Sequence, residues 1–152
     1  ARRPAAVSAC LPAPARSLPA DASRRTVHGD RPSSAARGRG YGPVPATEKA
    51  LKKAGLTIAD IGLFEINEAF AVQVLAFLDH FGIADDDKRV NIYGGAIAVG
   101  HPLASSGVRL MLNLARTFEE KPDVRYGITT MCIGLGMGGT VIWENPHFGK
   151  KA

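Results

Sequence analysis

The sequence contains few of the features that build disulfide scaffolds or membrane spans. Cys10 and Cys132 are its two cysteines in 152 residues, and they form no set of spaced pairs. A disulfide framework is therefore disfavoured, and a reducing compartment is favoured. No apolar run reaches membrane-spanning length, and no basic start leads into a hydrophobic signal core. We therefore expect an intracellular protein without a membrane partner.

The first forty residues lack lysine and carry little apolar surface. They contain eight arginines against two aspartates, a balance of +6, and few large apolar residues: Val7, Leu11, Leu18 and Val27. Such a segment cannot bury enough surface to offset the entropy of ordering it. We therefore expect residues 1–40 to be disordered and outside the fold, which leaves residues 41–152 as one domain.

Three origins of the arginine-rich segment stay open. As a transit peptide it would need an amphipathic helix, which its prolines break. As a nucleic-acid-binding arm it would need interleaved aromatic residues for base stacking, and it has none. The third origin is a mis-called or frame-shifted start of the protein. Out-of-frame translation of GC-rich DNA gives many arginines and few lysines. Residues 41–152 have a balance of −1, so nothing in their charge calls for nucleic acid.

Helical and extended patterns alternate from residue 41 onward, as they do in an α/β fold. Glycines stop the first two helices, and β-branched or aromatic residues mark the strands. The predicted elements are helices over 46–54, 67–81 and 106–120 and strands over 60–67, 124–133 and 140–144. The last two strands form a hairpin, because the stretch between them is rich in glycine.

The helix that opens at Asn67 is apolar on nearly every side. Over residues 69–81 only Gln73, Asp79 and His80 are polar. A helix without a polar face is buried all round, and the 112 residues after the arginine-rich segment leave little chain to cover both of its sides. We therefore expect a partner layer that is missing from this chain or supplied by another.

One stretch presents a single imidazole on a glycine-rich loop. Residues 91–107 contain four glycines, and His101 is followed by Pro102, which keeps the histidine backbone out of the helical region. Ser105 and Ser106 then offer N-cap oxygens to the next helix, whose N-terminus favours negative charge. The arrangement suits a site where an oxyanion develops. The alternative is a tight loop whose histidine only satisfies the backbone.

Two further side chains stand where a strand ends. Cys132 is followed closely by four glycines, which leave room for a substrate beside its sulfur. The thiol becomes a nucleophile or acid–base group if a neighbour such as His101 lowers its pKa; otherwise it is a small buried hydrophobe. Asn67 either caps the helix that follows it or projects into a site above the strand ends. A metal site is disfavoured, because Cys132 and His101 lack partners at ligand spacing.

The chain closely resembles the thiolase family in three motifs: Asn67-Glu68-Ala69-Phe70, Gly100-His101-Pro102 and Cys132-Ile133-Gly134. Thiolases are acyl-CoA C-acyltransferases that make or cleave a 3-ketoacyl-CoA. The resemblance runs from Tyr41 to about Asn145 and implies the C-terminal half of a fold of two similar βαβαβαββ halves. That half is a layered α/β structure with a mixed sheet, and its first strand is incomplete in this sequence. One departure is Ala104, where most thiolases have glycine; it removes no catalytic group.

The resemblance implies roles for seven positions. Cys132 would move a proton to or from the α-carbon or the CoA thiol. His101 would donate a hydrogen bond to the enolate or thioester oxygen and help activate a first cysteine, and Asn67 would hold a water in the same oxyanion hole. The Gly134 N–H would point toward the acyl-enzyme oxygen. The positions implied to bind CoA or the acyl chain are Phe70, Gly100 and Gly136.

The resemblance also implies CoA and acyl-CoA as substrates, no tightly bound cofactor, and a homodimer or homotetramer as the complete enzyme. The setting would be fatty acid metabolism such as β-oxidation, in the cytoplasm if the thiolase is of bacterial type, with mitochondria and peroxisomes left open. The nucleophile motif of the N-terminal half is absent, and Cys10 does not match it. The alternative to an enzyme is therefore a non-catalytic truncated fragment. A decarboxylating ketosynthase is disfavoured, because it uses a His pair in place of His plus Cys.

Overall fold

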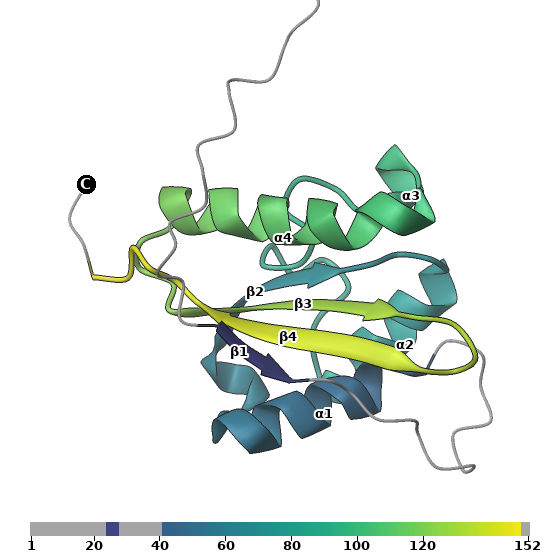
Figure 1. The fold of residues 1–152 in the computed structure, drawn as a ribbon, viewed down its shortest axis with the longest axis horizontal. Coiled ribbons are helices and arrows are strands. Elements are labelled where there is room, and N and C mark those ends of the chain that lie inside the picture. The colour runs from purple at the N-terminus through teal and green to yellow at the C-terminus, as the bar shows by residue number, and fades with distance from the viewer. Residues whose placement is uncertain (1–23, 28–40, 150–152) are drawn as a thin grey trace, which may run out of the picture.

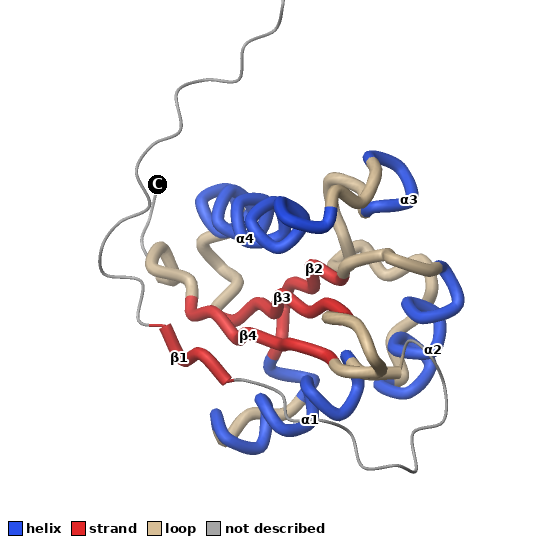
Figure 2. Tube along the Cα trace, turned by 45° about the vertical axis from the view of Figure 1, so that its right-hand side comes forward, coloured by secondary structure: helices blue, strands red, loops and turns tan. Residues whose placement is uncertain are grey.

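The computed structural model describes residues 24–27 and 41–149. In these ranges a four-stranded sheet lies between α4 on one face and α1 with α2 on the other (Figures 1 and 2). The elements in chain order are β1 (Arg24–Val27), α1 (Pro43–Ala54), the one-turn 3-10 helix η1 (Ile58–Asp60), β2 (Ile61–Ile66), α2 (Ala71–Phe81), α3 (Ala96–Val99), α4 (Leu103–Glu120), β3 (Tyr126–Cys132) and β4 (Gly138–Glu144).

The sheet has the strand order β1-β4-β3-β2 and is mixed. β2 and β3 run parallel, while β4 is antiparallel to both β3 and β1. The parallel pair is joined by a long crossover that contains α2, α3 and α4, and the antiparallel pair by the short glycine turn. The fold class expected from the sequence is confirmed.

The first two long helices end at the glycines that were predicted to stop them. α1 begins at Pro43, where proline loses no intrahelical hydrogen bond, and it stops at Gly55 with φ of 68°. α2 stops in the same way at Gly82, with φ of 65°. The starts of all three predicted helices differ from expectation: α1 begins at Pro43 in place of residue 46, α2 at Ala71 in place of 67, and α4 at Leu103 in place of 106.

The expectation of a disordered segment was wrong at four residues. Arg24–Val27 form β1, which pairs with β4 from Arg24 opposite Trp143 to Val27 opposite Thr140. The apolar content of the segment did not indicate this strand, because backbone pairing to the edge of β4 requires no apolar side chain. The rest of the expected segment, 1–23 and 28–40, lies outside the described residues, and the domain boundary at residue 41 stays a prediction.

Two apolar clusters hold the helices on the sheet. The larger one lies on the side of α1 and α2 and includes Phe64, Phe77 and Ile128, all almost fully buried. On the other side, Leu114 and Phe118 of α4 pack with Leu63 of β2. They come so close to β3 that a Cβ on its Gly127 would lie 2.7 Å from Leu114. Among the described residues, no helix has the length and apolar content needed to cross a membrane.

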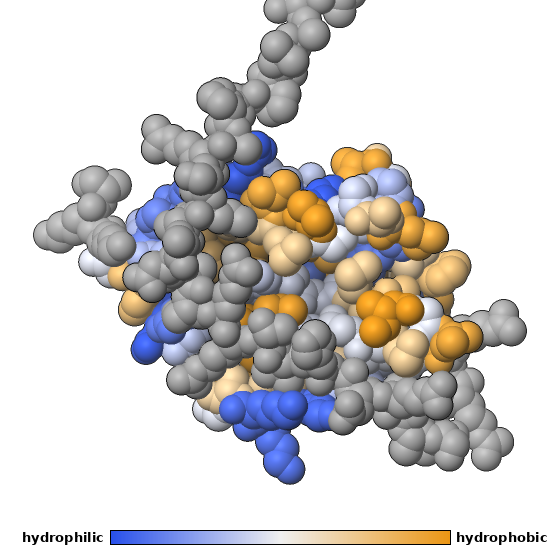
Figure 3. Space-filling model, in the orientation of Figure 1, coloured by the Kyte–Doolittle hydropathy of each residue, from blue (hydrophilic) through white to orange (hydrophobic). Residues whose placement is uncertain are grey.

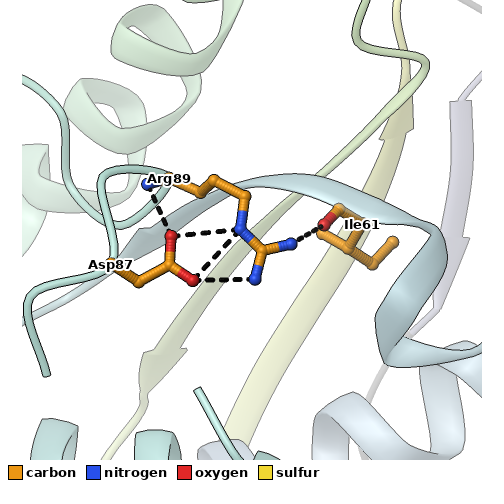
Figure 4. Close-up of polar contacts among 3 residues, drawn as sticks. All are labelled: Ile61, Asp87 and Arg89. Carbon is orange, nitrogen blue, oxygen red and sulfur yellow. Dashed lines mark hydrogen bonds and ion pairs between the residues drawn. The ribbon is translucent and has the colours of Figure 1, made fainter. Parts of the chain in front are cut away.

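The outer edge of β2 is closed by the segment that follows α2. Val90 forms a parallel bridge with Phe64. Arg89 fixes this segment: its guanidinium donates to both carboxylate oxygens of Asp87 and, at 3.1 Å, to the carbonyl of Ile61 (Figure 4). These hydrogen bonds hold the pKa of the Asp87 carboxyl below its usual value. The edge therefore offers little backbone for pairing with another chain.

The described residues do not shield α2 on every side. Its inner side is buried through residues such as Phe77 and Leu78, but Val72 is 71% exposed and Leu75 49% exposed. The expected partner layer on this helix stays a prediction.

A close backbone contact ties β4 to the start of α1. A Cβ on Gly138 would collide with the carbonyl of Gly42, whereas a Cβ on Gly139 would lie 3.8 Å from Ile133, an ordinary contact.

We expect Gly138→Ala to lower the free energy of unfolding by about 3 kcal/mol through overpacking. The matched control Gly139→Ala should change it by less than about 1 kcal/mol. Urea unfolding measures both, and equal effects would contradict the assignment of this contact.

Candidate active site

The ends of the parallel strands bring the three motifs to one edge of the sheet. Ile66 lies opposite Thr130, and the Asn67 N–H extends the ladder by donating to the Thr130 carbonyl at 2.9 Å. Cys132 is two residues further along β3. In Figure 1 this edge lies at the right, together with α3 and the β3–β4 turn. Carboxyl ends of parallel strands are where open α/β sheets bind ligands.

Asn67 is fully buried and its amide is directed at His101. Its Nδ2 lies 3.3 Å from Nε2 of His101, and its Oδ1 is buried without a hydrogen-bond partner among the described residues. The N-cap of α2 is Phe70, in an extended conformation, so Asn67 does not cap that helix. Of the two readings left open by the sequence, the structure agrees with the amide projecting above the strand ends.

Ser106 fixes the other side of the imidazole. His101 Nδ1 lies 2.7 Å from Ser106 Oγ, and that hydroxyl donates its own proton to the Pro102 carbonyl at 3.0 Å. Since the hydroxyl proton is used, the serine oxygen accepts from Nδ1–H, and Nε2 keeps a lone pair toward Asn67. The hydrogen-bond network thus places the ring proton on Nδ1 and leaves Nε2 as an acceptor.

The sequence analysis missed this role of Ser106. It assigned Ser105 and Ser106 to the N-cap of the following helix, but the N-cap is Pro102, without a side-chain cap, and both serines lie in the first turn. A serine in the first turn of a helix places its hydroxyl near the residue before that helix. The spacing of five from His101 to Ser106 was the available signal.

Cys132 is the last residue of β3, opposite Gly138 of β4, and it is a partly exposed free thiol. Among the described residues, none of the hydrogen bonds involves its sulfur. The structure therefore places Cys132 at the same edge as the imidazole of His101 without showing a contact between them. Their convergence on one pocket stays a prediction.

The glycine turn after Cys132 contains a backbone N–H group that has no acceptor among the described residues. Gly134 has φ of 88° and Gly136 φ of 75°, conformations that glycine adopts without strain. Within the described ranges, the Gly134 N–H donates to no acceptor, while its carbonyl accepts from Met137 N–H at 2.9 Å. Between the two glycines, Leu135 is 92% exposed.

The positions expected to bind substrate belong to three different segments of the chain: the start of α2, the end of α3 and the β3–β4 turn. Phe70 is 64% exposed at the start of α2, and Gly100 ends α3 with φ of 90°. The structure joins neither of them to Gly136 by a hydrogen bond. A cavity of about 220 Å³ lies nearby, lined by residues of α4, β3 and β4 such as Leu110, Met131 and Val141, and neither His101 nor Cys132 lines it.

Three side chains fix the loop that carries His101. Asn91 accepts from the Ile66 N–H at 2.7 Å and donates to its carbonyl at 3.0 Å. Glu68 accepts from Asn91 Nδ2 at 2.8 Å and from the N–H of Ile97 in α3 at 3.0 Å. Arg109 of α4 donates to the Gly100 carbonyl at 2.7 Å. The short α3 is thus held from both ends. No group of three or more His, Cys, Asp or Glu in the described ranges is arranged to hold a metal ion.

A buried carboxyl lies behind this loop. Glu65 is 3% exposed, and burial raises its pKa to about 7, against opposing contributions from Asn113 and Arg109. Asn113 donates to it across a long 3.4 Å. The sequence analysis did not single out Glu65, because alternation in a short strand gives no sign that a charged residue faces inward.

The sequence of this fold matches a known family. A model of the family described as "Thiolase, C-terminal domain" matches residues 25–145, a stretch that begins in β1. The chain therefore belongs to the thiolase family, and the resemblance drawn from the three motifs is confirmed.

Its relatives include proteins named 3-ketoacyl-CoA thiolase. Over 106 residues the chain is 58% identical to the one from Aeromonas hydrophila subsp. hydrophila, 54% to that of Pectobacterium carotovorum and 53% to that of Escherichia coli. In each case the match covers 69% of this chain and 27% of the relative. The matched part thus spans about a quarter of the length of these relatives.

The hydrogen bond between Ser106 and His101 sets the tautomer of the imidazole. We expect Ser106→Ala to weaken the preference for protonation at Nδ1 by about 1 kcal/mol, roughly fivefold in the tautomer ratio. Long-range ¹H–¹⁵N correlation spectra of the imidazole measure that ratio. Ser105→Ala is the matched control, because the Ser105 hydroxyl bonds only the Pro102 carbonyl, at 3.4 Å. An unchanged ratio in Ser106→Ala would show that the serine does not orient the ring.

The raised pKa of Glu65 makes stability depend on pH. The folded state holds this proton up to about pH 7, whereas an unfolded chain releases it near the ordinary glutamate pKa of 4.5. The free energy of unfolding should therefore fall as pH rises between those values, by up to about 3 kcal/mol. Glu65→Gln should flatten that slope in urea unfolding from pH 4.5 to 8. A wild-type profile that rises over this range, with the same rise in Glu65→Gln, would contradict the shift.

Proposed function

We propose that this chain supplies the proton-handling half of the active site of a thiolase-type acyltransferase, which moves acyl groups between CoA thioesters. The arrangement of Asn67, His101 and Ser106 beside the end of β3 carries the proposal. An imidazole whose Nε2 lone pair meets only the long contact from Asn67 Nδ2 can accept a proton and afterwards donate a hydrogen bond from the same nitrogen. That sequence fits a site where a thiol is first deprotonated and an oxyanion then forms.

The proposed roles follow the direction of thiolysis. His101 Nε2 takes the proton of the acyl-accepting cysteine, which the N-terminal half of the thiolase fold would provide. That sulfur attacks the 3-keto carbon of the substrate, and the bond between the α- and β-carbons breaks. The electron pair remains as the enolate of acetyl-CoA, whose oxygen takes a hydrogen bond from Nε2–H. Cys132 Sγ–H then protonates the α-carbon.

The second half-reaction returns both protons. The Cys132 thiolate takes the proton of an incoming CoA thiol, and the CoA sulfur attacks the acyl-cysteine thioester. The unpaired Gly134 N–H supports its assignment as a donor to the thioester oxygen. When the acyl group leaves on CoA, His101 gives its proton back to the first cysteine. The buried, unpartnered Asn67 Oδ1 supports the proposal that Asn67 holds a water beside the oxyanion.

An exposed apolar surface beside the site supports the proposal that another layer of the protein covers it. Exposed apolar side chains lie over α3, α4 and the β3–β4 turn (Figure 3). They include Ile97, Val99, Leu103, Val108, Met111, Leu112, Ile133 and Leu135. Patches of this kind mark interfaces. We propose that the N-terminal half of the fold covers this surface, in a cytoplasmic homodimer or homotetramer with CoA and acyl-CoA as substrates.

The test is a chimera in which this chain replaces the matched segment of the Aeromonas hydrophila 3-ketoacyl-CoA thiolase. We expect CoA-dependent cleavage of acetoacetyl-CoA, with kcat reduced by roughly 10²–10⁴-fold in Cys132→Ala or His101→Ala. Lys53→Gln, on the exposed end of α1, is the control and should leave the rate unchanged.

Two outcomes would contradict the proposed acyltransferase function. One is a folded chimera without turnover, which would favour the non-catalytic alternative. The other is a Cys132→Ala chimera that keeps the wild-type rate. The isolated 152-residue chain is expected to show no turnover, because the acyl-accepting cysteine lies in the half that the chimera provides.

A further inference from the structure

We infer that Glu68 is a positioning residue for the Asn67–His101 pair: its carboxylate fills the space that Gly95 leaves open and fastens α3, and with it the backbone of His101, to the segment that carries Asn67. The inference rests on the proposed function only in taking this pair as the active one.

The Glu68 carboxylate bridges two segments that are distant in the sequence. Its Oε1 accepts from Asn91 Nδ2 at 2.8 Å, and its Oε2 accepts from the Ile97 N–H at 3.0 Å. Asn91 is itself fixed to β2, because its N–H donates to the Phe64 carbonyl at 2.8 Å and its amide pairs with both backbone groups of Ile66. One hydrogen bond of the carboxylate is therefore anchored to the sheet, and the other holds α3.

The short helix α3 depends on such a bond from outside. It has four residues, and a helix of this length is not stable through its own hydrogen bonds. The Ile97 N–H is one of the donors at its start that have no acceptor within the helix, and Glu68 supplies that acceptor. At the other end the Gly100 N–H donates to the Ala96 carbonyl at 2.8 Å, and His101 is the next residue. The position of α3 therefore sets the position of the His101 backbone.

Gly95 leaves the space that the carboxylate occupies. It is the buried N-cap of α3 and is extended, with φ of −102° and ψ of −167°, a conformation that does not require glycine. A Cβ on Gly95 would nevertheless overlap the carboxyl carbon and both oxygens of Glu68. The glycine is thus required by the neighbouring carboxylate and not by its own backbone. Because that carboxylate is the end of a flexible side chain, a Cβ would displace it and break its two hydrogen bonds without blocking the fold.

Glu68 acts on both members of the pair. It follows Asn67 directly in the chain, and through Ile97 it holds the helix that leads to His101. The contact between Asn67 Nδ2 and His101 Nε2 is a long one, 3.3 Å, so a small movement of α3 away from Glu68 opens it. The bond of the ring to Ser106 involves neither Glu68 nor α3 and is kept.

The first test measures the contact between the Asn67 amide and the imidazole in the 152-residue chain, by nuclear Overhauser effects between their protons. We expect Glu68→Gln to shift the balance from contact to no contact by roughly fivefold, because an amide has one acceptor oxygen and one of the two hydrogen bonds is lost. Glu119→Gln, an exposed acid of α4, is the control and should leave the signal unchanged. An unchanged signal in a folded Glu68→Gln chain would overturn the inference.

Gly95→Ala tests the same link from the opposite side. It should weaken the contact as Glu68→Gln does. In a Glu68→Ala background the space is vacant, so Gly95→Ala should add no further loss. Losses that multiply in the double variant would contradict the inference, because two independent structural roles predict additive free energies. A Gly95→Ala chain with the wild-type contact would contradict it too, even if the Glu68 variants fail to fold.

The chimera separates this inference from the proposed function. In it, Glu68→Gln and Gly95→Ala should each lower kcat by about tenfold with KM unchanged, because a misplaced catalytic group slows turnover without weakening substrate binding. An inactive wild-type chimera together with the expected loss of the Asn67–His101 contact would contradict only the proposed function. An active chimera whose Glu68→Gln variant keeps the wild-type kcat would contradict only the role of Glu68.

Discussion

The structure depends on the parallel pairing of β2 with β3. One backbone hydrogen bond, from the Asn67 N–H to the Thr130 carbonyl, extends this pairing past the end of β2. Because the strands run in the same direction, Ile66 and Thr130, which are 64 positions apart in the sequence, lie at one edge. The crossover between them returns the loop of His101 to that same edge. The three motifs of the family are thus gathered by sheet topology before any side chain takes part.

Much of this arrangement could be predicted from the sequence. Glycine stops at Gly55 and Gly82, alternation in β2, and the glycine turn before β4 each follow from local conformational preference. Helix starts were harder to place, because the apolar spacing of α2 extends back over residues that in the structure bond to β3 and to His101. β1 was missed, because its pairing to β4 is a backbone property that composition does not reveal.

For the site, the sequence indicated which residue types matter but not their contacts. His101 and Asn67 were singled out separately, and only the fold shows them 3.3 Å apart. Ser106 and Glu65 were assigned to a helix cap and a strand, because their roles depend on neighbours that are distant in sequence or brought near by a turn. These contacts are properties of the packed structure: the Glu65 carboxyl of β2 accepts from Asn113 of α4, and Arg109 of α4 donates to the Gly100 carbonyl at the end of α3.

The contact between Gly42 and Gly138 joins the start of α1 directly to the start of β4. Backbone touches backbone there, so no flexible side chain can absorb a displacement of α1. Gly138 is opposite Cys132 and begins the strand that leaves the turn of Gly134. A chain or ligand that pushed α1 outward would pull on this turn from the opposite side of the sheet. A displacement of α1 would therefore reach the backbone directly opposite Cys132.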